Sequence, residues 1–135
     1  MITHTPEVLD FSSMEKDSVQ YETIRGHYLF SGLDEDVFEA IAADFATESF
    51  EKGEILFHRG DVADDFYFIE SGQIELSLIS PDGQKKVVEV IANGRTFAEA
   101  IVFMREAKFP VTAEALSNSV VDRIPHITYR TMVRS

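Results

Sequence analysis

Five glycines divide the middle of this chain into segments of similar length. Gly53, Gly60, Gly72, Gly83 and Gly94 follow one another at intervals of 7, 12, 11 and 11 residues. The segments between them alternate apolar and polar side chains, and this period of two predicts half-buried β-strands. Turn glycines at such intervals are typical of an antiparallel sandwich or barrel. The chain is therefore expected to be mainly β.

The expected strands share this alternation of apolar and polar residues, and they are found at residues 55–58, 66–69, 74–78, 87–91 and 113–124. Two tight connections are predicted between them. Pro81-Asp82-Gly83 is a turn in which proline sets φ, and Asn93-Gly94 is a strong hairpin signal.

Helical periodicity flanks the β-region. Asp34 is expected to cap a helix whose single apolar face is formed by Val37, Phe38, Ile41 and Phe45. A second helix is expected after Pro125, because proline is tolerated in a first helical turn. Only about ten residues remain there, fewer than the roughly 12 that an isolated helix needs, so we expect that helix to continue past Ser135.

These patterns predict a loose N-terminal leader over residues 1–16 and one domain over residues 17–135. The domain is expected to comprise a helical start (17–46), a β-roll (47–124) and the beginning of a C-terminal helix (125–135). A chain of 135 residues with 44% apolar residues can bury one proper core.

Composition restricts the cellular setting and the partners. No apolar run approaches the length of a membrane-spanning helix, no secretory signal is visible, and the absence of cysteine excludes an iron–sulfur cluster held by this chain. A cytoplasmic location is expected. The net charge of −12 disfavours direct binding to nucleic acid or to an anionic membrane.

No catalytic or metal-binding motif is visible. The adjacent acids Asp64-Asp65 and 34–36 are expected to point apart, so they do not form a general acid/base pair. The sequence has no nucleophile elbow, no phosphate loop, no zinc motif and no EF-hand loop. The chain is predicted not to be an enzyme and not to hold a metal.

The candidate binding stretch runs from Gly94 to Met104 and continues through residues 108–113. The small residues Ala98-Glu99-Ala100 are expected to open a short apolar helix, whose free N–H groups and positive dipole end suit an anion. Glu99 is favoured at that end and can accept a hydrogen bond from a hydroxyl group. The alternative is a short helix that only closes one end of the β-fold.

Three motifs carry a family resemblance: Leu29-Phe30-Ser31-Gly32-Leu33, then Gly53-Glu54-Ile55-Leu56-Phe57-His58-Arg59-Gly60-Asp61, then Phe66-Tyr67-Phe68-Ile69-Glu70-Ser71-Gly72-Gln73-Ile74-Glu75-Leu76. Over roughly residues 25–130 the chain resembles the cyclic-nucleotide-binding domain, and more narrowly the sensor half of bacterial CRP/FNR-type transcription regulators. Phe97-Ala98-Glu99-Ala100-Ile101-Val102-Phe103-Met104 with Thr112-Ala113 is most similar to the dissimilatory nitrate respiration regulators, which respond to nitric oxide and are thought to use haem.

The resemblance implies an eight-stranded jelly-roll (a double-stranded β-helix) with flanking helices and a ligand pocket inside the roll. In nucleotide-binding members, a Gly-Glu-Leu run meets the cyclic phosphate and the ribose hydroxyl, and a later arginine pairs with the phosphate. This sequence keeps the glutamate as Glu99, while the arginine position falls on Lys108 or Phe109. Lysine is only a point charge and phenylalanine has none, which disfavours cyclic AMP. The candidate ligand-binding residues are Phe97, Ala98, Glu99, Ala100, Ile101, Lys108, Phe109 and Thr112.

The apolar side chains of the stretch would suit a large hydrophobic ligand such as haem, and they suit ordinary core packing equally well. They are Phe97, Ile101, Phe103, Met104 and Phe109. The available axial ligands are His4, His27, His58 and His126, besides Met104 and the tyrosines. The sequence does not choose among them.

Two functions follow from the resemblance. In the first, the chain is the sensor of a transcription regulator that binds a small effector. DNA would then be bound only through a C-terminal domain absent from these residues, and the full-length regulator would be a homodimer. In the second, it is a stand-alone module that acts by protein contact or by sequestering its ligand.

Overall fold

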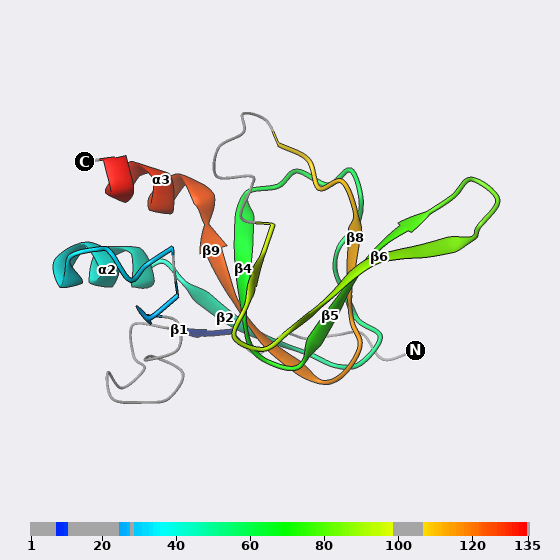
Figure 1. Ribbon diagram of the computed structural model, residues 1–135, viewed down its shortest axis with the longest axis horizontal. Helices are drawn as coiled ribbons and strands as arrows, with labels where there is room; N and C mark the ends of the chain where they lie inside the picture. Colours follow the sequence, from blue (N-terminus) through cyan, green and yellow to red (C-terminus); the bar gives the residue numbers. More distant parts are fainter. Residues whose placement is uncertain (1–7, 11–24, 28, 99–106, 135) are drawn as a thin grey trace.

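The computed structural model describes residues 8–10, 25–27, 29–98 and 107–134. Within these residues, nine antiparallel strands form two facing sheets, with the orders β1-β2-β9-β4-β7 and β3-β8-β5-β6, and two helices lie together at one end (Figure 1). The strands are β1 Val8–Asp10, β2 Ala46–Phe50, β3 Ile55–Phe57, β4 Asp65–Ser71, β5 Gln73–Ile79, β6 Lys85–Ala92, β7 Thr96–Phe97, β8 Thr112–Ala115 and β9 Ser119–Pro125. The helices are α2 Glu35–Ala42 and α3 His126–Arg134.

This architecture confirms the expected mainly β jelly-roll with flanking helices. Strands β2 to β9 account for the eight expected strands of the roll. β1 is an addition, because it pairs with β2 from within the segment expected to be a loose leader. No helix in the part of the chain that the structure describes is long and apolar enough to cross a membrane.

Two sequence expectations about connections are wrong. Asn93-Gly94 does not close a hairpin, because β6 and β7 belong to different sheets. Gly94 instead donates its N–H to Ile69 O on β4, at 2.8 Å. The single run expected over 113–124 is two strands, β8 and β9, which also lie in different sheets. In both places the chain crosses between the layers of the roll, which local turn chemistry does not reveal.

The expected hairpin at Pro81-Asp82-Gly83 is confirmed. It joins β5 to β6, and Gly83 adopts φ +87° in the turn. The helix expected after Asp34 is also confirmed, although the Asp34 side chain makes no capping hydrogen bond. The helix expected after Pro125 is confirmed as α3.

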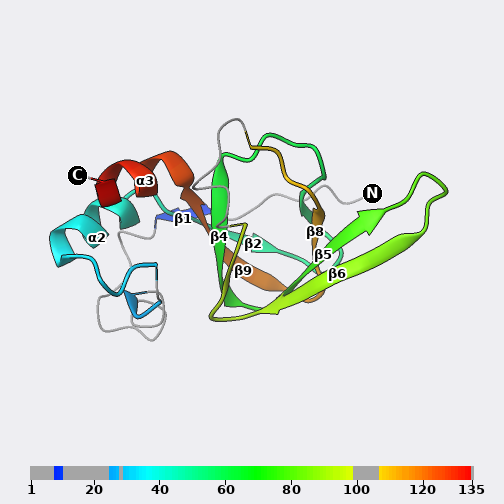
Figure 2. The same cartoon turned by 45° about the horizontal axis from the view of Figure 1, so that its top comes forward.

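A cluster of aromatic rings, the helix-side cluster, attaches the helices to the five-stranded sheet. Its members are Phe30, Phe38, Phe45, Phe66 and Tyr129. Phe30 is central, with edge-to-face contacts to Phe38, Phe45 and Tyr129 at centroid distances of 5.6–5.8 Å. Such pairs contribute roughly 0.5–1.5 kcal/mol each beyond burial. The turned view of Figure 2 shows α2 and α3 side by side at this end of the roll.

β4 divides the interior into two compartments. Phe66 contacts Tyr129 of α3 on the helix side, whereas Tyr67 stacks on Phe97 on the other face of the sheet. Because successive side chains of a strand point to opposite faces, neighbouring residues of β4 serve both compartments.

Gly72 is the single residue between β4 and β5, where the chain changes sheet. Its φ is +103°, and a Cβ built there would lie 2.7 Å from the Ser119 Cα. Glycine is therefore required twice over, by backbone conformation and by the close approach of β9.

We expect Gly72→Ala to destabilise the fold more than Gly83→Ala does. Gly83 has a similar φ of +87° but nothing within 4 Å of its Cβ position, so its substitution should cost only the left-handed strain of about 1–2 kcal/mol. At Gly72 the clash should add roughly 1–3 kcal/mol. Urea unfolding of both variants measures the difference, and equal losses would contradict the close approach.

A buried carboxyl lies on β9. Asp122 is fully buried and accepts a hydrogen bond from Thr47 Oγ1 at 2.5 Å. Burial, a hydrogen bond with the Glu70 side chain and the charge of Glu70 raise the pKa of Asp122 to about 9. The folded state therefore holds a proton here that the unfolded chain releases above its pKa of 3.8.

We predict that this proton makes stability fall as pH rises. The stabilisation is complete below pH about 4 and is lost as pH rises through about 9, the raised pKa of Asp122. The slope should be at most about 1.4 kcal/mol per pH unit. Asp122→Asn should flatten the unfolding free energy between about pH 5 and 8, whereas Asp82→Asn, on the exposed hairpin turn, should keep the wild-type slope. A wild-type slope in Asp122→Asn would refute the assignment.

Candidate functional site

Four aromatic rings fill the space between the two sheets, and we call them the roll-side cluster: Phe57 of β3, Tyr67 of β4, Phe97 of β7 and Phe109. Their exposed fractions lie between 2% and 5%. Phe57 stacks on Phe109 with centroids 3.6 Å apart and planes inclined by 11°. Tyr67 stacks on Phe97 at 5.0 Å and 13°. Phe57 joins the two pairs, at 5.6 Å from Tyr67.

The strands place these rings by alternation and register. Tyr67 and Phe97 are directly opposed partners of β4 and β7. Phe57 is opposed to Ala113 of β8, on the face of the smaller sheet that carries buried residues. The two sheets thus each turn aromatic side chains toward the same space.

The structure brings two of the predicted site residues, Phe97 and Phe109, into the roll-side cluster. Lys108 lies at the surface, where it forms an isolated bridge with Val62. Of the two residues at the expected arginine position, the one that points inward is therefore the uncharged Phe109. Glu99, Ala100 and Ile101 lie outside the described residues, as does the short helix expected there.

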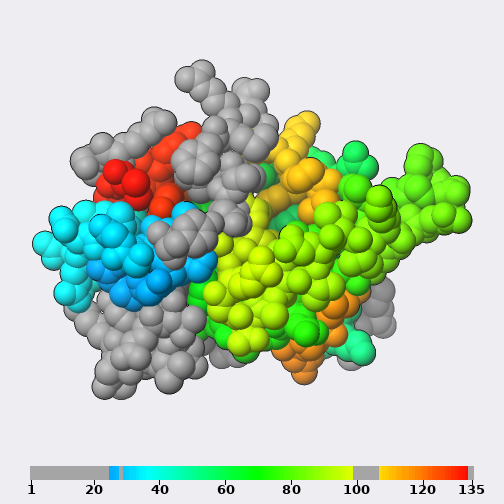
Figure 3. Space-filling view, viewed as in Figure 1, coloured from blue at the N-terminus to red at the C-terminus, as the bar shows by residue number. Residues whose placement is uncertain are grey.

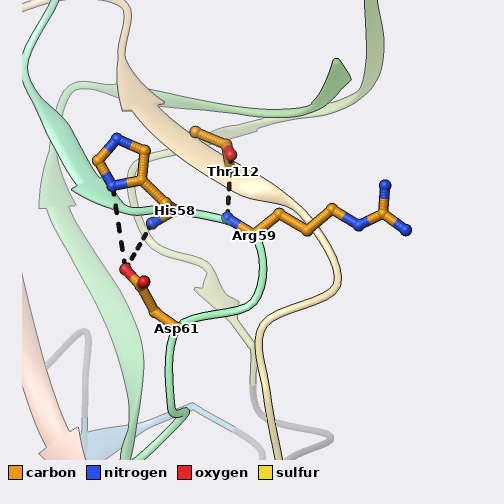
Figure 4. A network of polar contacts seen from close by, with 4 residues as sticks. All are labelled: His58, Arg59, Asp61 and Thr112. Atoms are coloured by element: carbon orange, nitrogen blue, oxygen red, sulfur yellow. Dashed lines mark hydrogen bonds and ion pairs between the residues drawn. The ribbon is translucent and has the colours of Figure 1, made fainter. Parts of the chain in front are cut away.

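Thr112 begins β8 beside the turn that follows β3. Its Oγ1 accepts a hydrogen bond from the Arg59 backbone N–H at 3.0 Å, as Figure 4 shows. In the same turn Asp61 Oδ2 accepts the backbone N–H of His58 at 2.9 Å. Thr112 thus fixes the shape of this turn.

A charged group that sequence reasoning missed lies on the same face as Tyr67. Arg123 of β9 is the direct partner of Tyr67 across the sheet, and its Cζ is 6.0 Å from the Tyr67 ring centroid. Its Nη2 lies 3.0 Å from Glu48 Oε1, and its Nε lies 3.7 Å from Asp65 Oδ2. Two carboxylates thus surround one guanidinium, so the group has no positive charge to spare for an anion.

Burial sets the protonation of this group. Desolvation raises the pKa of Asp65, against the lowering effect of Arg123. Desolvation also raises the pKa of Tyr67 to about 12, so its hydroxyl stays neutral at physiological pH. The site therefore combines an aromatic interior with an internally compensated guanidinium.

Glu48 and Arg123 come together only through the pairing of β2 with β9, which no local sequence pattern reveals.

The described histidines do not fit an axial haem ligand at the roll-side cluster. His27 lies on the other face of the larger sheet, where its Nε2 is 3.3 Å from Thr96 Oγ1. His58 is exposed beside Asp61, and His126 begins α3. His4 and Met104 lie outside the described residues. Nor do those residues contain a group of three or more acidic or histidine side chains suited to a metal ion.

Residues 47–135 match the family described as the cyclic nucleotide-binding domain. This chain belongs to that family.

Two kinds of protein illustrate the relationship. The sensor domain of the transcriptional regulator DNR from Pseudomonas aeruginosa superposes with a TM-score of 0.82 at 29% identity, over 87% of this chain and 78% of that one. In the whole DNR chain the match is 30% identical with a TM-score of 0.82, and it covers 90% of this chain and 54% of DNR. A cAMP-dependent protein kinase regulatory subunit from Blastocladiella emersonii is 29% identical over 80% of this chain, which spans 27% of that subunit.

Ala98 carries backbone strain at the entrance to the candidate stretch. Its φ of +63° is the one positive φ among the described residues other than glycine. The family resemblance places a glycine here, and glycine adopts this conformation without a steric penalty.

We predict that Ala98→Gly stabilises the fold by about 0.5–1 kcal/mol, because relief of left-handed strain exceeds the entropy that glycine adds to the unfolded chain. Ala107→Gly is the matched control. Ala107 is buried with an ordinary φ, so its substitution should destabilise. Thermal and urea unfolding measure both changes, and a loss of stability in Ala98→Gly would contradict the strain.

Proposed function

We propose that this chain is the effector-sensing domain of a CRP/FNR-type transcription regulator and that its effector is a small apolar molecule rather than a cyclic nucleotide. The structural similarity to the DNR sensor domain supports the first part of this proposal, that the chain belongs to a transcription regulator. The observation that carries the choice of effector is the stacked Phe57–Phe109 pair, with ring centroids 3.6 Å apart. Phe109 is one of the two positions at which the family resemblance places the arginine of nucleotide-binding members.

The charge balance of the roll supports the same choice. Within the described residues, the guanidinium beside the ring cluster is Arg123, and Glu48 and Asp65 already compensate it. A cyclic phosphate placed here would be desolvated without a counter-charge, which is costly. An apolar effector would instead exchange ring–ring contacts for ring–ligand contacts. Haem has no part in this proposal, because the described histidines do not reach the cluster. Burial also raises the pKa of Tyr67 to about 12, which disfavours the ionised hydroxyl that would ligate iron.

The coupling to DNA follows from differential binding. An effector that prefers one arrangement of the roll-side rings would favour one position of β4 and of its partner strand β9. Because α3 continues directly from β9, the direction of α3 would change with it. The effector can shift the domain only by its difference in affinity for the two arrangements. DNA contact would be made by a separate domain, since this chain has a net charge of −12.

Calorimetric titration with cyclic AMP tests the effector class. We expect no saturable heat up to millimolar nucleotide, and a cAMP-dependent kinase regulatory subunit under the same conditions provides the positive control. Saturable micromolar binding that Glu99→Ala abolishes would overturn the apolar effector.

The encoding gene tests the coupling to DNA. We expect the reading frame to continue past the Ser135 codon into a long helical segment and then a basic helix-turn-helix pattern. A stop codon directly after Ser135 would favour the stand-alone module instead.

A further inference from the structure

A surface hollow of about 430 Å³ lies between the β5–β6 hairpin and the turn after β3. The walls that the hairpin contributes are residues 78–81 and 84–86, and the turn contributes Arg59. All of these residues are exposed except Leu78, which is half-buried, so the hollow is open to solvent. Figure 3 shows the hairpin, in yellow-green, standing out from the body of the molecule.

The register explains why the hairpin protrudes. β8 pairs with β5 only over Ile74–Ser77, so the hairpin beyond Ser77 is held by β5–β6 pairing alone. Leu78 and Lys86 are directly opposed across the two strands, so both side chains leave the same face. By alternation that face continues from Ile74, which is fully buried in the core. The hollow thus extends the inner face of the smaller sheet beyond the roll.

The walls of the hollow concentrate positive charge on an acidic protein. Arg59, Lys85 and Lys86 are three of only 12 basic residues in a chain of net charge −12. Lys85 is engaged by Glu75 and lies 4.0 Å from Glu114. Within the described part of the chain, Arg59 and Lys86 form no ion pair. Figure 4 shows the Arg59 side chain extending away from Asp61 and Thr112.

Apolar side chains lie among these charges. Leu78 lies on the same face as Lys86, and Pro81 is exposed in the turn that joins the two strands. Ile79 is directly opposed to Lys85, so by alternation its side chain leaves the other face.

We propose that this hollow docks a short acidic segment of a partner protein, with carboxylates at Arg59 and Lys86 and an aliphatic side chain on Leu78 and Pro81. The hollow is too open to enclose a small anion. A short segment with few carboxylates can meet the two unpaired cations without extending over the rest of the acidic surface. A long phosphate chain, or a second copy of this acidic protein, would be repelled by that surface. The site is separate from the roll-side cluster and does not depend on the effector.

Fluorescence anisotropy of a labelled peptide of alternating glutamate and leucine, titrated with the 135-residue chain, tests the proposal. We expect saturable binding that weakens with added salt, and no binding of the matched glutamine–leucine peptide. Arg59→Glu should weaken binding at least about tenfold, because the attraction between a peptide carboxylate and the Arg59 guanidinium becomes a repulsion between two carboxylates. Lys52→Glu makes the same charge change on an exposed residue outside the hollow and should have little effect. Pro81→Ser should weaken binding without unfolding the chain, since Pro81 lines the hollow and is exposed.

Three outcomes would overturn the proposal. The first is absence of binding at low salt, and the second is an equal loss in Lys52→Glu and Arg59→Glu. The third is self-association of the chain that Arg59→Glu abolishes in sedimentation velocity, because the occupant would then be a second copy.

Discussion

The antiparallel pairing of β4 with β9 is the constraint on which the rest of the molecule depends. It brings Tyr67 beside Arg123 on the roll side and Phe66 beside Ile124 on the helix side. A shift of one residue in this register would exchange the two faces and place charge where rings now pack. The helix-side cluster, the roll-side cluster and the compensated guanidinium all follow from one ladder of backbone hydrogen bonds.

The sequence was sufficient to predict most of the elements but not their partners. Alternation located β3 to β6, and the helix after Asp34 was predicted from its apolar spacing. β1 and β2 were not expected as strands, and β8 and β9 were predicted as one. Asn93-Gly94 was predicted to close a hairpin because turn residues report only local backbone conformation. The sheet that the next strand joins depends on contacts between distant segments. The required glycine at 72 is a similar case, since its constraint comes from Ser119, 47 positions further along the chain.

Site residues that belong to a local sequence pattern could be predicted, whereas site residues that are brought together from distant strands could not. Phe97 and Phe109 were identified from a family pattern, and both point into the roll. The fold buries Phe109 and exposes Lys108, a difference that the sequence alone does not show. The trio of Glu48, Asp65 and Arg123 joins three strands, so no short motif could have revealed it.

The junction between β9 and α3 has a mechanical consequence. Strand residue Pro125 is followed at once by helix residue His126, so no loop absorbs motion between them. The direction of α3 is therefore set by the last peptides of a strand that also carries Arg123. A rotation of a few degrees at this junction would displace the far end of the nine-residue helix, about 13 Å away, by roughly 1 Å. A small change in the backbone of β9 is therefore converted into a larger displacement at the end of α3.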